Sequence, residues 1–478
     1  MSEQKPIEDA SAEASATRTP IAATVAGLRA AFDAGRTKPL AWRRTQLARL
    51  DALLAENGPA LEAALWADLR KSGAEAQYSE IGFTRAELGS VAAHLRGWLR
   101  PMRVPVPAAL LPASAKVVLE PLGVVAIIAP WNYPVQLTLA PAIGALAAGN
   151  AVVIKPSELA PATARLLGEL VPRYLDPEAV AVVEGGVPET TELLAQRFDH
   201  IFYTGNGTVG RIVLEAAAKH LTPVTLELGG KSPTYIDDTV DLDAAAARIA
   251  WGRFVNAGQT CIAPDYVLAT AEVQAKLGPA LARQVERYFG ADPAASPDYG
   301  RVVDDRHFAR LSGLLGAGEV VTGGQTDAAE RYLAPTVLAD VPRDAPVMQQ
   351  EIFGPILPMV TVTGLDDAIR YINAHDKPLA LYVFTEDART KKRFTTETSS
   401  GALGFGIPLG HIGVHALPFG GVGASGMGAY HGRRSVELFS HAKAVLSKPL
   451  SPDTIQLIAP PYTPARENLI RKVLGRIS

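Results

Sequence analysis

Short apolar runs alternate with helix-like segments through the middle of the chain. The runs rich in Val, Ile, Leu and Ala are predicted as strands: 124–128, 151–154, 180–183, 200–203 and 224–226. The segments with apolar residues at helical spacing are predicted as helices: 137–148, 160–170 and 209–218. Apolar strands joined by helices are typical of a parallel sheet covered on both faces. The pattern therefore predicts a doubly wound α/β domain, which binds ligands at the carboxyl ends of its strands.

The flanking segments show other patterns. Apolar residues from Ile21 to Phe32 fall at helical spacing, which predicts a helix before the sheet. From residue 101 to 120, prolines interrupt short extended pieces, a pattern that favours edge strands or an arm. Near the end of the chain, residues 468–474 have the pattern of a short amphipathic helix, which is expected to dock on the protein.

Composition and charge narrow the range of functions. The 478 residues carry a formal net charge of −3 and show no basic run or zinc-spaced cysteines, so nucleic acid is not an expected partner. No apolar run reaches the roughly 18 residues of a membrane-spanning helix, and no span is expected. Residues 1–20 lack the apolar core of a signal peptide. They are predicted to form a disordered tail, and the expected location is cytoplasmic.

Cys261 is the only cysteine of the chain, so all thiol chemistry depends on this one sulfur atom. A lone cysteine is commonly a small buried apolar residue. Here it follows Asn256-Ala257-Gly258-Gln259-Thr260, and such small, amide-bearing and hydroxylated residues favour a turn that exposes backbone N–H groups. The context therefore favours a nucleophile, which needs a base and donors for a developing oxyanion.

A dinucleotide-binding pattern lies between a predicted strand and a predicted helix. Residues 205–210 read Gly-Asn-Gly-Thr-Val-Gly, which satisfies G-x-G-x-x-G in the context that this fingerprint requires. The fingerprint alone would assign Glu227 to the cofactor ribose. Lys155 and Glu158 leave another strand end together, and they offer a donor and an acceptor for vicinal hydroxyls. We therefore assign the ribose to these two residues, which leaves Glu227 for catalysis.

Six motifs occur in order along the chain and share one resemblance. They are Pro130-Trp131-Asn132-Tyr133-Pro134, Lys155-Pro156-Ser157-Glu158, Glu227-Leu228-Gly229-Gly230-Lys231-Ser232-Pro233, Gly258-Gln259-Thr260-Cys261, Glu351-Ile352-Phe353-Gly354-Pro355 and Pro418-Phe419-Gly420-Gly421. With these motifs the chain resembles the aldehyde dehydrogenase superfamily over essentially everything after its tail. The segments 132–134, 423–428 and 430–432 most resemble the class 3 and bacterial coniferyl-aldehyde dehydrogenase branch.

The resemblance implies a catalytic mechanism. Cys261 would attack an aldehyde to give a thiohemiacetal, whose oxyanion would be held by the side-chain amide of Asn132 and the backbone N–H of Cys261. Oxidation by the nicotinamide cofactor would leave a thioester, and Glu227 would activate the water that releases the acid. The implied activity is NAD(P)-dependent oxidation of an apolar aldehyde, either aromatic or medium- to long-chain aliphatic.

The resemblance also implies the cofactor contacts. Glu351 and Phe353 would position the nicotinamide ribose and flank the ring, while Lys155 and Glu158 would hold the adenosine ribose. A carboxylate at Glu158 should repel a 2′-phosphate, so NAD is the expected cofactor, with NADP possible. The other implied contacts are Trp131, Thr204, Gly205, Gly210 and Leu228, whereas Gly207 is incidental.

The implied fold is α/β, with two open α/β domains and an extended oligomerisation arm. The predicted segments are a Rossmann-like cofactor domain (21–100 and 121–230), a catalytic domain (231–417), the arm (101–120 and 436–447), and C-terminal pieces that pack on the cofactor domain and the arm (418–435 and 448–478). In the family the extended pieces pair across a subunit interface, so a homodimer is expected.

Two alternative functions stay open at this stage. One is an acylating dehydrogenase that passes the thioester to coenzyme A, although Glu227 argues against it. The other is a non-catalytic dinucleotide-binding or redox-sensing protein. His411 and His415 have the i, i+4 spacing of a metal pair, but Gly413 lies between them and no third ligand is evident, so no metal is predicted.

The chain departs from the class 3 branch in one segment. At Gly406, within residues 404–410, the branch usually has an asparagine. This region normally lines the substrate entrance, and the resemblance therefore says least about substrate range.

Overall fold

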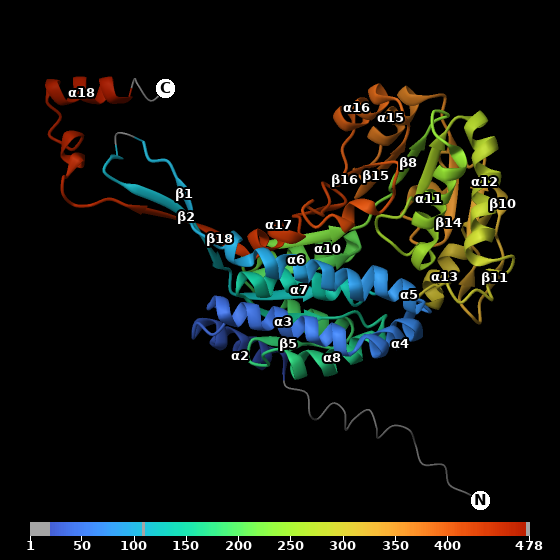
Figure 1. Cartoon of the computed structure of the whole chain (residues 1–478), viewed down its shortest axis with the longest axis horizontal. Helices are drawn as coiled ribbons and strands as arrows, with labels where there is room; N and C mark the ends of the chain where they lie inside the picture. Colours follow the sequence, from blue (N-terminus) through green and yellow to red (C-terminus); the bar gives the residue numbers. More distant parts are fainter. Residues whose placement is uncertain (1–19, 108–109, 475–478) are drawn as a thin grey trace, which may run out of the picture.

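Two open α/β domains and a projecting arm make up the chain (Figure 1). The structure is a computed structural model that describes residues 20–107 and 110–474. The α/β fold class predicted from the sequence is confirmed. The predicted disordered tail falls almost entirely on residues 1–19, which lie outside the described residues.

The first sheet has six strands in the order β17-β7-β6-β3-β4-β5. Its strands are β3 (Val124–Ile128), β4 (Ala151–Lys155), β5 (Val180–Val182), β6 (His200–Gly205), β7 (Val224–Leu228) and β17 (Gly426–Met427). The strands β3 to β7 are parallel, and β17 pairs with β7 in the antiparallel direction. All five strands predicted from the apolar runs are present, and their carboxyl ends share one edge of the sheet.

Helices cover both faces of this sheet (Figure 1). They are α2 (Ile21–Asp33), α3 (Leu40–Glu56), α4 (Gly58–Leu69), α5 (Gly73–Ala76), the π-helical turn η1 (Gln77–Ile81), α6 (Gly82–Trp98), α7 (Gln136–Ala148), α8 (Pro161–Tyr174), α9 (Val187–Leu194) and α10 (Gly207–Ala218). Every residue of α7 is buried, because α3, α6 and α17 pack against it. This helix therefore carries apolar residues on all faces.

The second sheet has seven strands in the order β10-β13-β14-β9-β8-β15-β16. They are β8 (Pro233–Ile236), β9 (Tyr266–Ala269), β10 (Glu319–Thr322), β13 (Thr336–Ala339), β14 (Ile356–Thr361), β15 (Ala380–Phe384) and β16 (Ala402–Phe405). Only β10 runs antiparallel to its neighbour. A small β11 (Thr326–Asp327) and β12 (Tyr332–Leu333) hairpin accompanies this sheet.

The helices of this second domain are α11 (Leu242–Phe254), α12 (Ala271–Phe289), α13 (Asp305–Ser312), α14 (Pro346–Gln349), α15 (Leu365–Asn373) and α16 (Ala388–Glu397), with the 3-10 turns η3 (Val255–Gly258), η4 (Leu315–Ala317) and η5 (Gly410–Gly413). None of the helices in the described part of the chain is long and apolar enough to cross a membrane.

The arm is a three-stranded antiparallel sheet that projects from the first domain (Figure 1). It contains β1 (Met102–Val104), β2 (Ser114–Pro121) and β18 (Ser440–Ser447). Its second piece begins later than the predicted residue 436, because α17 (Gly432–Leu438) continues to residue 438 and buries Val436 against the first domain.

The C-terminal pieces lie in two places. Residues 418–435 return to the first domain, where β17 extends the sheet and α17 packs on α6 and α7. Residues 448–474, with η6 (Thr454–Leu457) and α18 (Pro464–Leu474), lie at the outer end of the arm (Figure 1). They contact the arm, one of the two places predicted for the C-terminal pieces, and Lys448 Nζ donates to the carbonyl of Leu110 at 3.0 Å.

Candidate active site

One cavity of about 700 Å³ brings the predicted site residues together. It is lined by residues that follow the carboxyl ends of β3, β4, β6 and β7 on one side and by Cys261 and residues 304–310 and 351–353 on the other. The predicted residues that line it are Cys261, Glu227, Asn132, Trp131, Lys155, Glu158, Thr204, Gly205, Leu228, Glu351 and Phe353. Gly210 does not line it; it lies in α10 against Leu228, whose Cδ2 would be 3.1 Å from an added Cβ.

Cys261 lies just after a turn with unusual backbone geometry. Asn256 and Ala257 have φ of 53° and 50°, in the left-handed region that non-glycine residues rarely adopt. The thiol is partly exposed to the cavity. Burial and the charges of Glu351 and Glu227 raise its pKa, although the backbone N–H groups of Cys261 and Ile262 act in the opposite direction. A thiol in this environment needs a base to form the thiolate.

Glu227 lies near the carboxyl end of β7 and is 3% exposed. Neither of its carboxylate oxygens has a hydrogen-bond partner among the described residues. Burial raises its pKa well above the usual range of a glutamate. A buried carboxylate without partners destabilises the fold, so its presence on a cavity with a thiol points to a catalytic group.

Asn132 is held by the same turn that precedes Cys261. Its side-chain amide donates to the carbonyl of Gln259 at 2.9 Å, and its own backbone carbonyl accepts from Asn256 Nδ2 at 2.8 Å. A primary amide carries two N–H donors, so the second N–H is available for an oxyanion in the cavity. The Asn132 side chain and the Cys261 segment are thus positioned as one unit.

Several residues that support this unit were not found by sequence analysis. Lys71, whose side chain is fully buried, donates to Glu80 at 2.5 Å and to the carbonyl of Asn132 at 3.2 Å. The other oxygen of Glu80 accepts the backbone N–H groups of Val135 and Gln136. Both residues belong to the N-terminal helical region, and no local pattern distinguishes them from surface charges.

Lys155 and Glu158 form an ion pair at the other end of the cavity. Lys155 Nζ donates to Glu158 Oε2 at 2.8 Å and to the carbonyl of Pro156 at 2.9 Å. The side chain of Glu158 is 45% exposed, so it is accessible to a ligand. Nearby, the hydroxyl of Thr204 is buried without a hydrogen-bond partner among the described residues. These groups provide donors and acceptors for a polar ligand.

The glycines of the 205–210 turn differ in their steric roles. A Cβ at Gly205 would lie 2.2 Å from the hydroxyl of Tyr203, which excludes a side chain without rearrangement. A Cβ at Gly207 would meet nothing closer than Arg211 Nη1 at 3.7 Å. The turn leads into α10, which is capped by the side chain of Asn206 on the N–H of Val209.

Glu351 and Phe353 project from one tightly held segment. Burial and the nearby charge of Asp265 raise the pKa of Glu351 to about 8, against the lowering effects of the Gly230 N–H, Lys231 and Arg253. Phe353 has φ of 51° and contacts the ring of Trp131 edge to face, with 5.3 Å between centroids.

His411 and His415, which have the spacing of a metal pair but were not predicted to bind a metal, contact different groups. His411 stacks on Phe419, whereas His415 Nδ1 lies 2.6 Å from Glu87 Oε2, and His431 Nδ1 lies 3.0 Å from the same oxygen. Glu87, His415 and His431 form the group of potential metal ligands found in the described part of the chain. Its distances are those of hydrogen bonds, shorter than the roughly 3.3 Å between two ligands of one zinc ion that bond lengths of 2.0–2.1 Å require. The absence of a metal stays a prediction.

The segment with the unusual Gly406 contributes no lining residue to the cavity. Gly406 has φ of 70°, and its carbonyl accepts from Arg248 Nη1 at 2.7 Å. Phe419 and Tyr430, which follow this segment, line the cavity instead and form an isolated antiparallel bridge with each other.

Comparisons with known proteins show the family of the chain. A family model described as "Aldehyde dehydrogenase family" matches residues 4–445. Aldehyde dehydrogenase family 3 member B1 of Rattus norvegicus is 52% identical over 437 residues, which cover 91% of this chain and 93% of the relative. A relative from Canis lupus familiaris, "Aldehyde dehydrogenase, dimeric NADP-preferring", is 48% identical and covers 91% of this chain and 96% of its own length.

Solved structures show the same similarity. The substrate-bound state of Staphylococcus aureus AldH has a TM-score of 0.93 and 41% identity, covering 96% of this chain and all of that one. A Mycobacterium tuberculosis aldehyde dehydrogenase complexed with NAD+ has a TM-score of 0.79 and 29% identity, covering 90% of each chain. The resemblance inferred from the six motifs is confirmed: the chain belongs to the aldehyde dehydrogenase family of NAD(P)-dependent oxidoreductases, with its curated relatives in family 3.

Proposed function

We propose that this enzyme oxidises an apolar aldehyde, aromatic or medium- to long-chain aliphatic, to its carboxylic acid with NAD(P). The observation that carries the proposal is that the only thiol and the unpartnered carboxylate of Glu227 line one cavity. The other end of that cavity is lined by the Lys155–Glu158 pair and the 205–210 turn. A coniferyl-type aldehyde belongs to the proposed class because it is aromatic, and Phe419 and Tyr430 supply aromatic surface on the cavity.

In the proposed mechanism, the Cys261 thiol gives its proton to the Glu227 carboxylate, and the Sγ thiolate attacks the aldehyde carbon to form a thiohemiacetal; Glu227 then releases this proton to solvent. The oxyanion accepts hydrogen bonds from the second N–H of Asn132 and the backbone N–H of Cys261. NAD(P), when bound, supplies the acceptor for the two electrons and the hydrogen that the carbon loses. Glu227 then takes a proton from water, which attacks the thioester carbonyl, and Sγ leaves as the thiolate.

The residues present fit such a cofactor. The buried hydroxyl of Thr204 has no partner among the described residues, and Gly205 keeps the strand end open for the close approach of a ligand. Lys155 and Glu158 would hold the adenosine ribose, α10 would direct its positive end toward the phosphates, and Glu351 would accept from the nicotinamide ribose. Phe353 and Trp131 would flank the ring.

The arm supports a homodimer as the proposed assembly. Apolar side chains of the arm and of the segment beyond it are exposed in the single chain: Met102, Leu111, Leu446, Leu450, Leu457 and Tyr462. A second copy of the chain would bury these side chains. Sedimentation would test whether the chain is a dimer. The cytoplasmic location stays a prediction that fractionation of the host cell would test.

Product analysis tests the proposal directly. We expect the purified chain with NAD or NADP and benzaldehyde, cinnamaldehyde or a long-chain aldehyde to release one carboxylic acid per NAD(P)H, without coenzyme A. An acyl-coenzyme A product that requires coenzyme A would assign the acylating reaction instead. If no aldehyde led to the formation of NAD(P)H, that result would support a binding or redox-sensing role.

Cofactor preference should depend on Glu158. If its carboxylate accepts from ribose hydroxyls, Glu158→Gln is expected to weaken the use of NAD more than that of NADP. The loss of a charge-assisted bond corresponds to about 1–2 kcal/mol, or a shift of roughly 5- to 30-fold in the ratio of kcat/KM values. Glu169→Gln, which changes an exposed carboxylate of α8 outside the cavity, is the control. An unchanged ratio in the Glu158 variant would place the ribose elsewhere.

The pH dependence of turnover should reflect the burial of Glu227. Since burial raises the pKa of this group, its base form grows over a pH range above that of an ordinary carboxylate. We expect kcat at saturating substrates to increase with pH above about 6, where an ordinary carboxylate is already ionised. A kcat that stays constant down to about pH 5 would contradict a buried base.

A further inference from the structure

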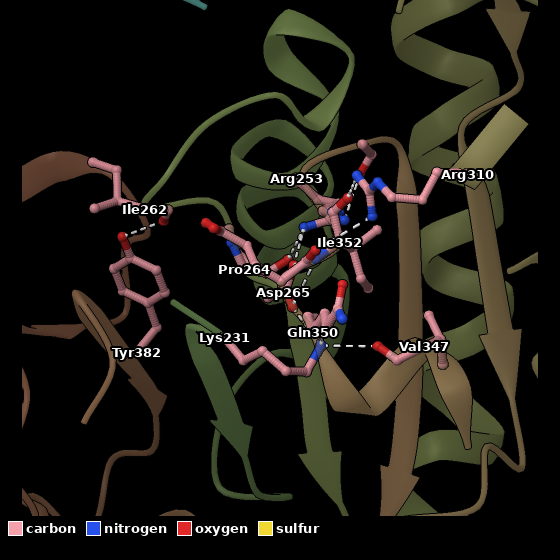
Figure 2. A network of polar contacts seen from close by, with 12 residues as sticks. Lys231, Arg253, Ile262, Pro264, Asp265, Arg310, Val347, Gln350, Ile352 and Tyr382 are labelled. Atoms are coloured by element: carbon pink, nitrogen blue, oxygen red, sulfur yellow. Dashed lines mark hydrogen bonds and ion pairs between the residues drawn. The ribbon is translucent and has the colours of Figure 1, made fainter. Parts of the chain in front are cut away.

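The carboxylate of Asp265 joins the nucleophile segment to the segment that carries Glu351 and Phe353. Asp265 is 2% exposed and lies just before β9, four residues after Cys261. Its Oδ1 accepts the backbone N–H of Ile352 at 3.1 Å, the residue between Glu351 and Phe353. Figure 2 shows this bond among the polar contacts around Asp265.

Two cations hold both Asp265 and the ends of the same segment (Figure 2). Lys231 Nζ donates to Asp265 Oδ2 at 2.6 Å and to the carbonyls of Val347 and Gln350 at 2.9 and 3.0 Å. Arg253 Nη1 donates to Asp265 Oδ1 at 3.2 Å, while its Nη2 donates to the carbonyl of Gly354. The cations thus hold carbonyls on both sides of Ile352, and Asp265 holds its amide.

The segment needs this support because its backbone is strained. Phe353 has φ of 51°, a conformation that costs a non-glycine residue roughly 1–2 kcal/mol. Arg310 Nη2 fixes the carbonyl of Ile352 at 2.6 Å, so both polar backbone groups of this residue are held. With Ile352 fixed from both sides, the Glu351 and Phe353 side chains are directed into the cavity that also contains Cys261.

We infer that Asp265 is a positioning residue, which sets where Glu351 and Phe353 hold the nicotinamide half of the cofactor relative to Cys261. This inference rests on the proposed function. Asp265 lines neither end of the cavity and therefore acts through Ile352. The adenosine half, at Lys155 and Glu158, is anchored on the other domain and does not depend on Asp265.

The test compares Asp265→Asn with a matched control. The control is Asp367→Asn, which also removes the charge of a buried aspartate. Asp367 pairs with Arg343 and accepts the backbone N–H of Thr363, but it lies in α15 and does not line the cavity. For Asp265→Asn we expect weaker NADH binding by about tenfold and a fall in kcat of about 10- to 100-fold, the cost of misplacing a reacting group. AMP, which probes the adenosine half, should bind within about twofold of the wild type, and Asp367→Asn should change none of these values by more than that.

Lys231→Met provides a second route if Asp265→Asn does not fold, because Arg253 still balances the Asp265 carboxylate. The same split between NADH and AMP is expected for it. Equal loss of NADH and AMP affinity would indicate general loosening and overturn the inference, as would unchanged NADH affinity in both variants. If the proposed function failed, the wild type itself would form no carboxylic acid. The comparison of NADH and AMP binding would still test the role of Asp265, so the two failures are distinguishable.

Discussion

Replacing Cys261 by serine is expected to abolish aldehyde oxidation while NADH binding is retained. The chain has no other cysteine, so no second thiol can substitute for it. A hydroxyl is far less acidic than a thiol, and the burial that already raises the pKa of Cys261 would disfavour an alkoxide further. We expect kcat to fall by about four to six orders of magnitude, the range found when a covalent nucleophile is removed.

Alkylation and binding provide the controls for this variant. One equivalent of iodoacetamide should inactivate the wild type completely, since the chain offers it only one thiol. The serine variant should bind NADH with unchanged affinity, because the substitution changes one atom of Cys261 and leaves Lys155, Glu158 and Thr204 intact. Substantial turnover by the serine variant would remove Cys261 from the mechanism.

The sequence predicted the parts of the molecule that depend on local patterns. The strands β3 to β7 were found because a buried parallel strand is an uninterrupted apolar run, which needs no knowledge of distant contacts. Cys261 was found because it is the only cysteine and follows a turn-like segment, and the 205–210 turn because it lies between a predicted strand and a predicted helix. Glu227 was assigned to catalysis because Lys155 and Glu158 offered a better ribose site. Strand topology brings Glu227 and the 205–210 turn to one edge of the first sheet, and Cys261 reaches the same cavity from the second domain.

The supporting residues could not be predicted in the same way. Lys71, Glu80 and Asp265 act on backbone groups that are distant in the sequence, such as the carbonyl of Asn132 and the amide of Ile352. A charged residue has the same local sequence pattern whether it is solvated or buried. The roles of Lys71 and Glu80 become evident only when distant segments of the first domain pack together, and that of Asp265 when distant segments of the second domain do.

The C-terminal pieces show the limit of periodicity. The apolar spacing of 468–474 predicts a helix, and α18 is present over Pro464–Leu474. Periodicity does not specify where a helix docks, and the path of β18 placed it at the outer end of the arm (Figure 1). The exposed apolar residues of the arm therefore became evident only in the structure.

Replacing Glu227 by glutamine is expected to separate thioester formation from thioester hydrolysis. The variant removes the base without removing a hydrogen bond between described residues, because neither carboxylate oxygen has a partner there. Its fold should be preserved, since a neutral amide is buried more readily than a carboxylate. Hydrolysis should slow by about two to four orders of magnitude, the usual contribution of a general base. Rapid mixing should then show a burst of NAD(P)H followed by a nearly stalled steady state.

Glu351→Gln is the matched control, because Glu351 is a second carboxylate on the same cavity whose pKa is also raised by burial. Its proposed partner is the nicotinamide ribose, so this variant should weaken NADH binding and should not produce a burst followed by a stall. A smaller burst in the Glu227 variant is compatible with the mechanism, since the same carboxylate can take the proton of Cys261. If Glu227→Gln instead lost NADH affinity and kept its hydrolysis rate at saturating cofactor, Glu227 would be the ribose-binding acid of the dinucleotide fingerprint. The water would then be activated by another group.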